Sequence, residues 1–203
     1  MEAKFDWLFW IDTSKVSRVL YISCEDKDHK QMEVCDINFY FRSINTIQEC
    51  KSICEEGEYY DLVYIQSLGI KEKDVFLKLG QLVADDGYFI LATIRRDILS
   101  RFFKKTIFKH IPTENEDVNI GVDLKRFVDR KIFEIYEELY VYPSVLSPWT
   151  LSNTDIILRQ MSWWKRSKNR KMLMIQKLFS ISIFAQLCIR FWPETINLYR
   201  KIR

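Results

Sequence analysis

Glycine and proline are scarce in this chain of 203 residues, which contains five glycines and four prolines. Turn-rich all-β folds and long flexible linkers use more of both, so the scarcity argues against these two architectures. The uncharged run Phe179–Ile189 covers 11 residues. A helix needs about 20 apolar residues to span a bilayer, so this run is too short to do so.

Signals for metal binding and for disulfides are also missing. The five cysteines include no C-x-x-C pair, and His29 and His110 are the only histidines. We therefore expect no zinc site, and free thiols in a reducing, cytoplasmic location. The N-terminal stretch has no apolar run long enough for a signal peptide. Cys50 and Cys54 lie one helical turn apart and are interpreted as ordinary buried thiols.

The chain has the composition of a folded domain, with 48% hydrophobic and 15% aromatic residues. Its net charge of +3 conceals an asymmetry. Residues 159–203 contain eleven basic residues and one acidic residue, a net charge of +10, against −7 for the rest of the chain. Such a basic segment favours anionic partners, including phospholipid head groups, phosphates, nucleic acid or an acidic protein.

Apolar strand-like runs alternate with helical periodicity in the first half of the chain. This alternation predicts an α/β fold with a Rossmann-like, mostly parallel sheet covered by helices on both sides. The expected strands are Val16–Ser23, Ile37–Arg42, Tyr60–Gln66 and Tyr88–Thr93. One helix is expected to start at Asn45-Thr46 and to stop at Gly57, and a second covers Lys73–Val83. A tight turn is expected at Asp85–Gly87.

The remaining segments are less regular. Glu25–Gln31 is wholly polar and predicts a loop or a short helix, and Phe133–Tyr142 fits a late strand or the end of a helix. We expect a Rossmann-like domain over residues 1–145. A helical, basic C-terminal extension over residues 146–203 would pack on it or beside it.

Ligands of open α/β sheets bind beyond the carboxyl ends of the strands. Arg95 and Arg96 follow the fourth expected strand at this edge and could hold a phosphate or a carboxylate; the alternative is a helix start with solvated arginines. Cys24 is a poor nucleophile candidate, because the neighbouring carboxylates would raise its pKa. His110 fits a surface histidine better than a general base.

The third and fourth strands carry a recognisable pattern. Asp61 leads the third strand, Leu79-Gly80-Gln81-Leu82-Val83 ends the helix that follows, and Asp85-Asp86-Gly87 stands at the corner before YFILAT. This pattern resembles the central segment of class I S-adenosylmethionine-dependent methyltransferases, over roughly Arg18 to Thr93. The resemblance implies that S-adenosylmethionine would contact Ser23, Cys24 and Glu25, and that its methyl-donor pocket would be bordered by Gln66 and Ser67.

Three features depart from that family. Its first strand is followed by an acidic residue and a G-x-G turn, whose glycines let the backbone approach the cofactor. Here Ser23 and Glu25 stand where the glycines would fall. The first and third strands are also close together in sequence, which leaves room for one clear strand and one helix and predicts the loss of a strand–helix unit. The acid that binds the ribose in the family has no clear equivalent, since Asp36 precedes the second strand instead of following it.

Three functional classes follow from these observations. The first is a methyltransferase-like pseudoenzyme with a degenerate cofactor site and a binding or scaffolding role. Its C-terminal half, with Tyr142-Pro143-Ser144 and Phe191-Trp192-Pro193, is similar to methyltransferase-like proteins of bacterial glycan and glycolipid gene neighbourhoods, so a glycan, lipid or natural-product pathway is implied. The second class is an active methyltransferase on a small-molecule, glycan or lipid acceptor. The third is a module that binds anionic membranes or nucleic acid.

The basic C-terminal segment is the basis for the third class, a module that binds anionic membranes or nucleic acid. Lys165 and Arg166 follow Trp163 and Trp164, a combination of cations and tryptophans typical of a membrane interface or an anion site. The alternative is a core helix with a basic outer face. Nucleic-acid binding needs basic residues interleaved with exposed aromatic residues, and beyond Trp163 and Trp164 nothing in the sequence supports it. A protein partner or a peripheral position at an anionic membrane is therefore favoured.

Overall fold

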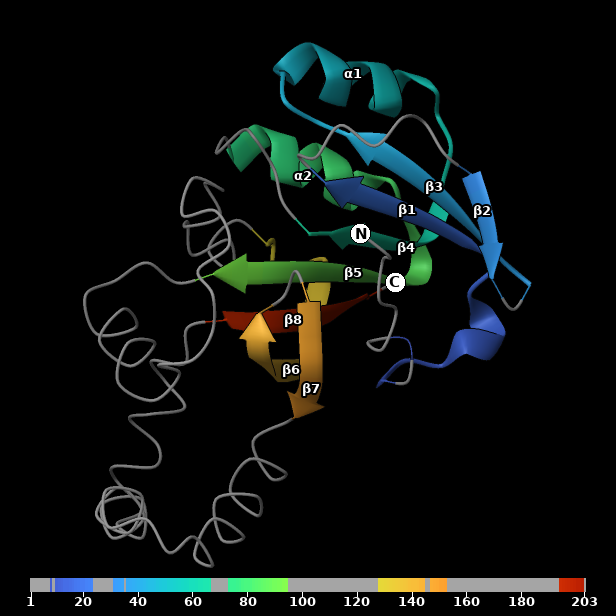
Figure 1. Cartoon of the computed structure of the whole chain (residues 1–203). Helices are drawn as coiled ribbons and strands as arrows, with labels where there is room; N and C mark the ends of the chain where they lie inside the picture. The colour runs from blue at the N-terminus through green and yellow to red at the C-terminus, as the bar shows by residue number, and fades with distance from the viewer. Residues whose placement is uncertain are drawn as a thin grey trace, which may run out of the picture.

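The computed structural model describes residues 8, 10–23, 31–34, 36–66, 73–94, 128–144, 147–152 and 194–202. These residues form one eight-stranded sheet, in the order β2-β3-β1-β4-β5-β8-β6-β7, with two α-helices packed on it (Figure 1). In chain order, the elements are the 3₁₀ turn η2 (Thr13–Lys15), β1 (Arg18–Ser23), β2 (Gln31–Val34), β3 (Ile37–Ser43), α1 (Ile47–Glu55), β4 (Tyr60–Ile65), α2 (Lys73–Gln81), β5 (Val83–Ile94), β6 (Phe133–Ser144), β7 (Ser147–Ser152) and β8 (Glu194–Lys201).

The sheet is mixed, which corrects the prediction of a mostly parallel one. Parallel pairing joins β3, β1, β4 and β5 into a continuous block. Strands β2, β8 and β7 each pair antiparallel with their neighbours. The parallel block forms the expected α/β core, while the antiparallel strands extend it on both sides.

The parallel block has a doubly wound strand order. The chain leaves β1 towards β3 on one side and then returns to β4 on the other side of β1. This reversal is the topological switch point of doubly wound sheets. The observed order supports the predicted Rossmann-like core and fixes where its ligand crevice would be, between the carboxyl ends of β1 and β4.

Both helices cover the same face of the sheet (Figure 1). The connections from β3 to β4 and from β4 to β5 step across the sheet in one direction, so right-handed crossovers place α1 and α2 together. The helices bury a shared set of apolar side chains against β1, β4 and β5, including Cys50, Ile53, Val75, Phe76 and Leu79.

The ends of the helices follow local signals. Thr46 caps α1: its hydroxyl accepts from the Glu49 amide (3.2 Å), and the Glu49 carboxylate accepts from the Thr46 amide (3.0 Å), which completes a capping box. Gly57, with φ of 67°, follows the helix as expected. Helix α2 ends at Gln81, so the prediction that it continues to Val83 was wrong. Val83 instead starts β5 and pairs with Tyr60.

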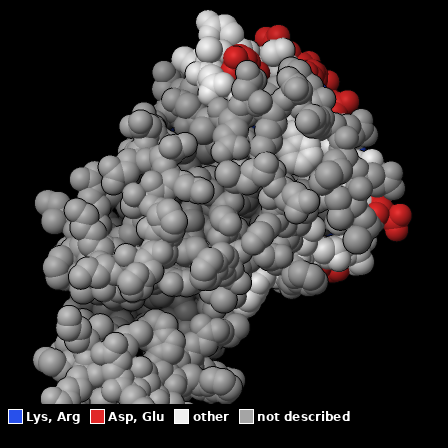
Figure 2. Space-filling view, in the orientation of Figure 1, with Lys and Arg blue, Asp and Glu red and all other residues white. Residues whose placement is uncertain are grey.

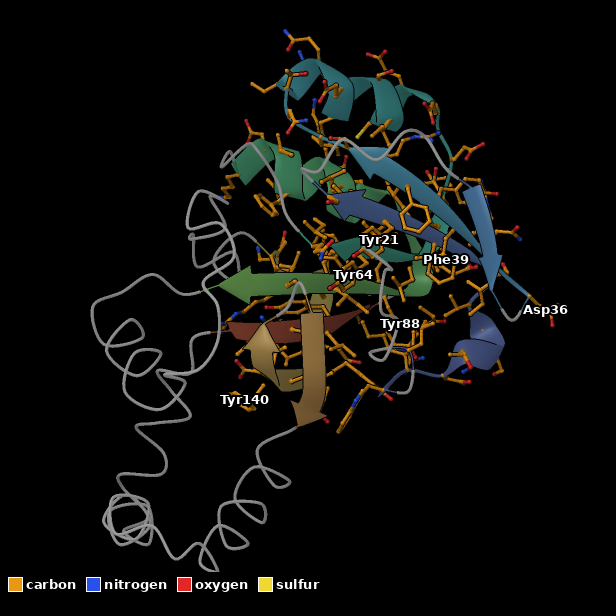
Figure 3. The ribbon with its side chains drawn as sticks, viewed as in Figure 1. Tyr21, Asp36, Phe39, Tyr64, Tyr88 and Tyr140 are labelled. Atoms are coloured by element: carbon orange, nitrogen blue, oxygen red, sulfur yellow. The ribbon has the colours of Figure 1, made fainter. Side chains whose placement is uncertain are left out.

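The opposite face of the sheet is rich in aromatic side chains (Figure 3). Tyr21 stacks on Tyr64 with ring centroids 4.8 Å apart and contacts Phe41 at 5.1 Å. Among the described residues, this face is covered by the N-terminal segment, through Leu8, Trp10, Ile11 and Val16. Helices therefore cover one face and an aromatic layer with an extended segment covers the other, within the part of the chain that the structure describes.

Strand β2 lies within a region predicted to be a polar loop. Gln31 was expected in that loop, and this assignment was wrong at Gln31 because it starts β2 and pairs with Tyr40 of β3. Strands β2 and β3 form an antiparallel hairpin in which Val34 pairs with Ile37 across two residues. Asp36 occupies this turn with φ of 63°, a conformation that aspartate tolerates better than most residues.

The corner at Asp85–Gly87 lies inside a strand and does not precede it. The pairing of β4 with β5 shifts from Tyr60–Val83 to Leu62–Tyr88, so β5 bulges between these points. Asp86 has φ of 61° there. A Cβ at Gly87 would lie 2.8 Å from the backbone oxygens of Ala84 and Asp61, so only glycine fits. The predicted tight turn is corrected to a bulge.

Two segments of the expected helical extension are strands of this sheet. Ser147–Ser152 forms β7 at the edge, and Glu194–Lys201 forms β8 between β5 and β6. The helical prediction was wrong at these positions, because long-range pairing on both sides of β8 decides its conformation. The alternative of a late strand at Phe133–Tyr142 is confirmed as β6. The prediction for residues 153–193 lies outside the described residues.

The described helices are short. α1 and α2 have nine residues each, and none of the described helices is long and apolar enough to cross a membrane.

Candidate functional site

The switch point brings together two of the predicted site residues, Ser23 and Gln66. Ser23 ends β1 and pairs with Ser43 of β3. Gln66 directly follows β4, and its amide donates to the carbonyl of Ile22 (2.9 Å), which extends the β1–β4 ladder by one step. Both side chains are buried. Ser23 and Gln66 therefore both lie at the carboxyl edge of the sheet.

Gln66 is engaged by a neighbour that the sequence did not single out. The Tyr21 hydroxyl donates to Oε1 of Gln66 at 2.7 Å, in a buried setting. Tyr21 lies on the aromatic face with Tyr64, and complete burial raises the pKa of the Tyr64 hydroxyl above its usual range. The side chains on this side of the switch point therefore form a packed layer of neutral groups.

The described part of the connection between β1 and β3 contains an antiparallel strand. A parallel strand pair needs a crossover of a dozen or more residues, usually a helix whose N-terminus faces the ligand. Here β1 is followed, after residues 24–30, by the hairpin β2–β3, whose second strand pairs parallel with β1. Among the described residues, no helix lies between β1 and β3.

The carboxyl end of β3 is where the resemblance places an acid for the ribose. The strand ends in Arg42 and Ser43, and neither is acidic. The next described carboxylate, Glu49, accepts from the amides of Asn45 (2.6 Å) and Thr46 (3.0 Å) in the helix cap. Arg42 lies 3.8 Å from Glu56 at the end of α1. The described groups at this strand end are thus used for local structure.

Asp61, which leads the family-like third strand, also has a structural role. Its carboxylate accepts from the Ser17 amide (2.9 Å), the Ser17 hydroxyl (2.8 Å) and the Arg18 amide (3.0 Å). These bonds join the start of β4 to the start of β1. Asp61 therefore lies at the amino edge of the sheet, opposite the ligand edge.

Several predicted site residues lie outside the described residues. These are Cys24, Glu25, Ser67, Arg95, Arg96, Lys165 and Arg166. That S-adenosylmethionine contacts this edge of the sheet therefore stays a prediction.

Two buried polar residues of β8 were missed by the sequence analysis. Thr195 and Asn197 are 1% and 3% exposed, and the Asn197 amide donates to the Thr195 hydroxyl at 3.2 Å. Thr195 pairs with Thr93, close to the carboxyl end of β5. The alternation of polar and apolar residues in ETINLYRK was the available signal, since Ile196 and Leu198 bury their side chains on the opposite face.

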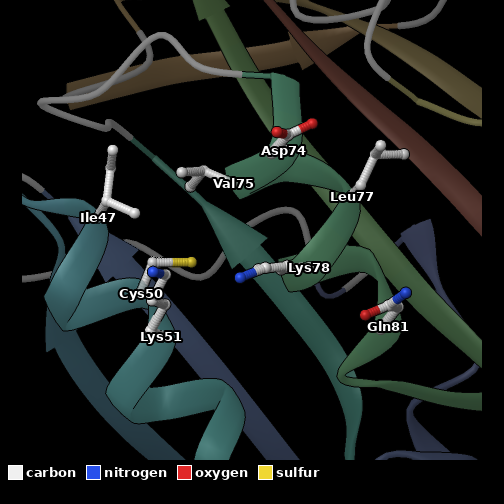
Figure 4. Close-up of a pocket in the computed structure, with 8 residues that line it drawn as sticks. All are labelled: Ile47, Cys50, Lys51, Asp74, Val75, Leu77, Lys78 and Gln81. Atoms are coloured by element: carbon white, nitrogen blue, oxygen red, sulfur yellow. The ribbon is translucent and has the colours of Figure 1, made fainter.

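A groove of about 430 Å³ lies between the two helices (Figure 4). Its walls include Cys50 and Lys51 of α1 and Val75 and Lys78 of α2. The groove lies on the helix-covered face, whereas Tyr21 and Gln66 belong to the aromatic side. Within the described residues, no cluster of three or more histidine, cysteine or acidic side chains could hold a metal ion.

Comparisons with known proteins give only distant likenesses. No protein-family model matches the chain, and no curated protein matches it. Among solved structures, the O-methyltransferase of a trans-AT PKS multienzyme of Brevibacillus brevis, in complex with S-adenosyl-L-homocysteine, shares 14% identity at a TM-score of 0.42, over 95% of this chain and 69% of that one. The StiE O-MT shares 11% identity at a TM-score of 0.41, over 95% and 70%.

Coclaurine N-methyltransferase bound to N-methylheliamine and SAH is a further similar structure. It shares 10% identity at a TM-score of 0.35, over 92% of this chain and 68% of that one. Likenesses this distant do not assign a family or an activity, so the interpretation rests on the strand order and side chains described above.

Proposed function

We propose that this protein is a methyltransferase-like pseudoenzyme: a Rossmann-like domain with a degenerate S-adenosylmethionine site and a binding or scaffolding role. The part it would play in a bacterial glycan, lipid or natural-product pathway follows from the sequence resemblance alone. The observation that carries the proposal is the connection after β1, which leads into the antiparallel hairpin β2–β3.

That connection matters because of what a cofactor needs at the switch point. In doubly wound folds, a glycine-rich turn and the N-terminus of the next helix offer free backbone amides to the ligand. The described residues between β1 and β3 form a strand and a turn with their own ladder partners. These described residues form a strand and a turn instead of a helix whose N-terminus would face the ligand, which supports the proposal.

The side chains of the switch point support the same proposal. Tyr21 donates to Gln66 Oε1 in a buried setting, so this acceptor already has a partner. No carboxylate ends β3, where the ribose hydroxyls of the cofactor would need an acceptor. A ligand there would have to break the Tyr21–Gln66 bond and bring its own hydrogen-bond partners.

Calorimetric titration of the whole protein with S-adenosylhomocysteine tests the proposal. We expect no binding heat, and no rise in melting temperature at about 100-fold excess over a typical family affinity. A ligand that bound at such an excess would stabilise the folded state by about 2.7 kcal/mol. Micromolar binding would overturn the proposal and establish a working cofactor site.

The second candidate is an active methyltransferase, and one observation favours it. Ser23 and Gln66 lie side by side at the switch point as the resemblance requires. A Gln66→Ala variant separates the two candidates. In an active enzyme it would weaken cofactor binding, whereas in the proposed pseudoenzyme it would only remove the partner of Tyr21.

The basic C-terminal segment is proposed as the site for an anionic partner, through Lys165 and Arg166. Acidic side chains gather where Figure 1 places α1 (Figure 2); Glu49 and Glu55 belong to this helix and Glu56 is its C-cap. This surface would repel an anionic membrane or nucleic acid. Flotation with vesicles that contain anionic lipid, at low and high salt, tests whether the basic segment binds an anionic surface. Salt-sensitive binding that is lost in a Lys165→Glu, Arg166→Glu variant supports the proposal. Unchanged flotation of this variant contradicts it.

A further inference from the structure

Two thiols form a pair on the helix-covered face. Cys50 and Cys54 lie one turn apart on α1, so their side chains lie on the same face of the helix. Cys50 is buried and Cys54 is half-buried against the same core cluster. The pair is therefore held in a fixed place, with both sulfur atoms on the side of α1 that faces the core.

A lysine and a groove lie beside the pair among the described residues. Lys78 of α2 is the cation whose charge favours ionisation of both thiols. Cys50 also lines the groove between α1 and α2, next to Lys78 (Figure 4). Lys51 lines the same groove but has no such effect on either thiol, which makes it a natural control.

A disulfide does not suit this pair. Residues four apart on a helix hold their Cβ atoms about 5–6 Å apart, whereas a disulfide needs about 3.5–4.5 Å. Burial raises the pKa of Cys50 to about 12 and also raises the pKa of Cys54. Both groups are thus neutral thiols near pH 7, and thiols react with oxidants much more slowly than thiolates do.

We propose that Cys50 and Cys54 form a two-coordinate site for a soft monovalent metal ion, Cu(I), which enters through the groove between α1 and α2. Thiolates select Cu(I) over hard cations, and Cu(I) accepts linear coordination by two sulfur atoms. Zinc would need four ligands, and the described residues supply no third donor. This proposal is independent of the proposed function.

The binding step releases protons and leaves a charged complex. Each thiol loses its proton as its Cu–S bond forms, so one Cu(I) ion and two thiols give a bis-thiolate complex of charge −1 and two free protons. Lys78 supplies the compensating positive charge on α2. Hg(II) would form a neutral complex with the same two sulfur atoms and would need no such compensation.

The first experiment measures Cu(I) affinity by competition with a chromogenic Cu(I) chelator under anaerobic conditions. The protein is the full chain with Cys24, Cys35 and Cys188 replaced by serine, so that only the pair remains. We expect one ion per chain and an affinity that rises about 100-fold per pH unit between pH 6 and 8, because two protons leave. A tenfold rise per unit, or no binding by this variant, would overturn the two-thiol site.

Substitutions then test the two sulfur atoms and the cation. Cys50→Ser and Cys54→Ser, checked for folding by circular dichroism, should each lower the Cu(I) affinity by at least about 100-fold. Lys78→Gln keeps both thiols and should weaken Cu(I) by about tenfold while leaving Hg(II) affinity unchanged, as the charge argument requires. Lys51→Gln should change neither. Equal effects of Lys78→Gln and Lys51→Gln would contradict the role of Lys78.

Discussion

The parallel block of the sheet contains two halves that are connected differently. From β3 to β5 the chain alternates strands with helices, and α1 and α2 cover one face. From β1 to β3 the described chain contains the antiparallel hairpin β2–β3. The face of the sheet opposite the helices carries an aromatic layer, which the N-terminal segment covers among the described residues. The helix-connected half keeps the doubly wound plan, and the hairpin-connected half departs from it.

The difference separates the pairing that fixes the order of the sheet from the connections that would shape a ligand site. Pairing of β1 with β3 and β4 fixes the core whether a helix or a hairpin joins the strands. Cofactor binding depends instead on the turn after β1 and on the end of β3. The β2–β3 hairpin and the non-acidic end of β3 both lie in the half that would hold a ligand, and these two observations support the pseudoenzyme proposal.

The largest expected effect concerns the core under the helices. Phe76 of α2 is 2% exposed, so Phe76→Ala should lower the free energy of unfolding by about 3–5 kcal/mol through lost burial and a cavity. Urea denaturation measures the loss. Ile47→Ala on α1, at a position 37% exposed, is the control and should cost under about 1 kcal/mol. Equal losses would mean that α2 does not anchor this half.

The next effect concerns the bulge in β5. Gly87→Ala would place a Cβ against the backbone oxygens of Ala84 and Asp61, so we expect a loss of about 1–3 kcal/mol in thermal or urea unfolding. Gly57→Ala provides a comparison, because its Cβ would meet no atom within 4 Å and the cost is limited to the strained φ of 67°. A neutral Gly87→Ala variant would show that the bulge relaxes freely.

Alkaline pH should weaken the helix-connected half through Cys50. Burial raises the pKa of Cys50 to about 12 in the folded state, above the value of about 8.5 of a free thiol. The unfolded chain ionises first, so this contribution to stability is complete below about pH 8.5 and declines as the pH rises towards 12. Between pH 7 and 11, the melting temperature of Cys50→Ala should fall less steeply than that of the unsubstituted protein. An equal fall in both proteins would contradict the assignment of this pH dependence to Cys50.

The smallest effect concerns the hairpin-connected half. Asp36→Gly should stabilise the protein by less than about 1 kcal/mol, because glycine adopts φ of 63° without the steric cost that aspartate bears. Asp36→Val should destabilise it, since a β-branched residue is strongly disfavoured there. Chemical denaturation of both variants measures the difference, and a change of the same sign in both would contradict the turn geometry.

The sequence was most informative where structure is local. The periodicity of Ile47, Cys50 and Ile53 and the cap at Thr46 predicted α1, and the apolar runs predicted β1, β3 and β4 within one or two residues. Strands β2 and β8 were missed because pairing with distant partners decides them, as for Thr195 against Thr93. The segment Glu194–Lys201, which the sequence suggested was part of a C-terminal extension, is a strand between β5 and β6.

The candidate site was predicted only in part. The meeting of Ser23 and Gln66 follows from the rule that ligand sites lie at the carboxyl ends of parallel strands. The partner of Gln66 did not follow, because the reach of the Tyr21 hydroxyl depends on the relative position of β1 and β4. Arg200 and Lys201, counted in the basic segment, instead face Asp86 and Asp85 at the bulge, at 3.8 and 3.3 Å.

Hydrogen–deuterium exchange with and without S-adenosylhomocysteine tests the central claim most directly, because it reports both binding and its location. The account predicts unchanged exchange in peptides covering Arg18–Ser23 and Tyr60–Gln66 at millimolar ligand. New protection confined to these two peptides would contradict the account, because it would show the ligand seated between the carboxyl ends of β1 and β4.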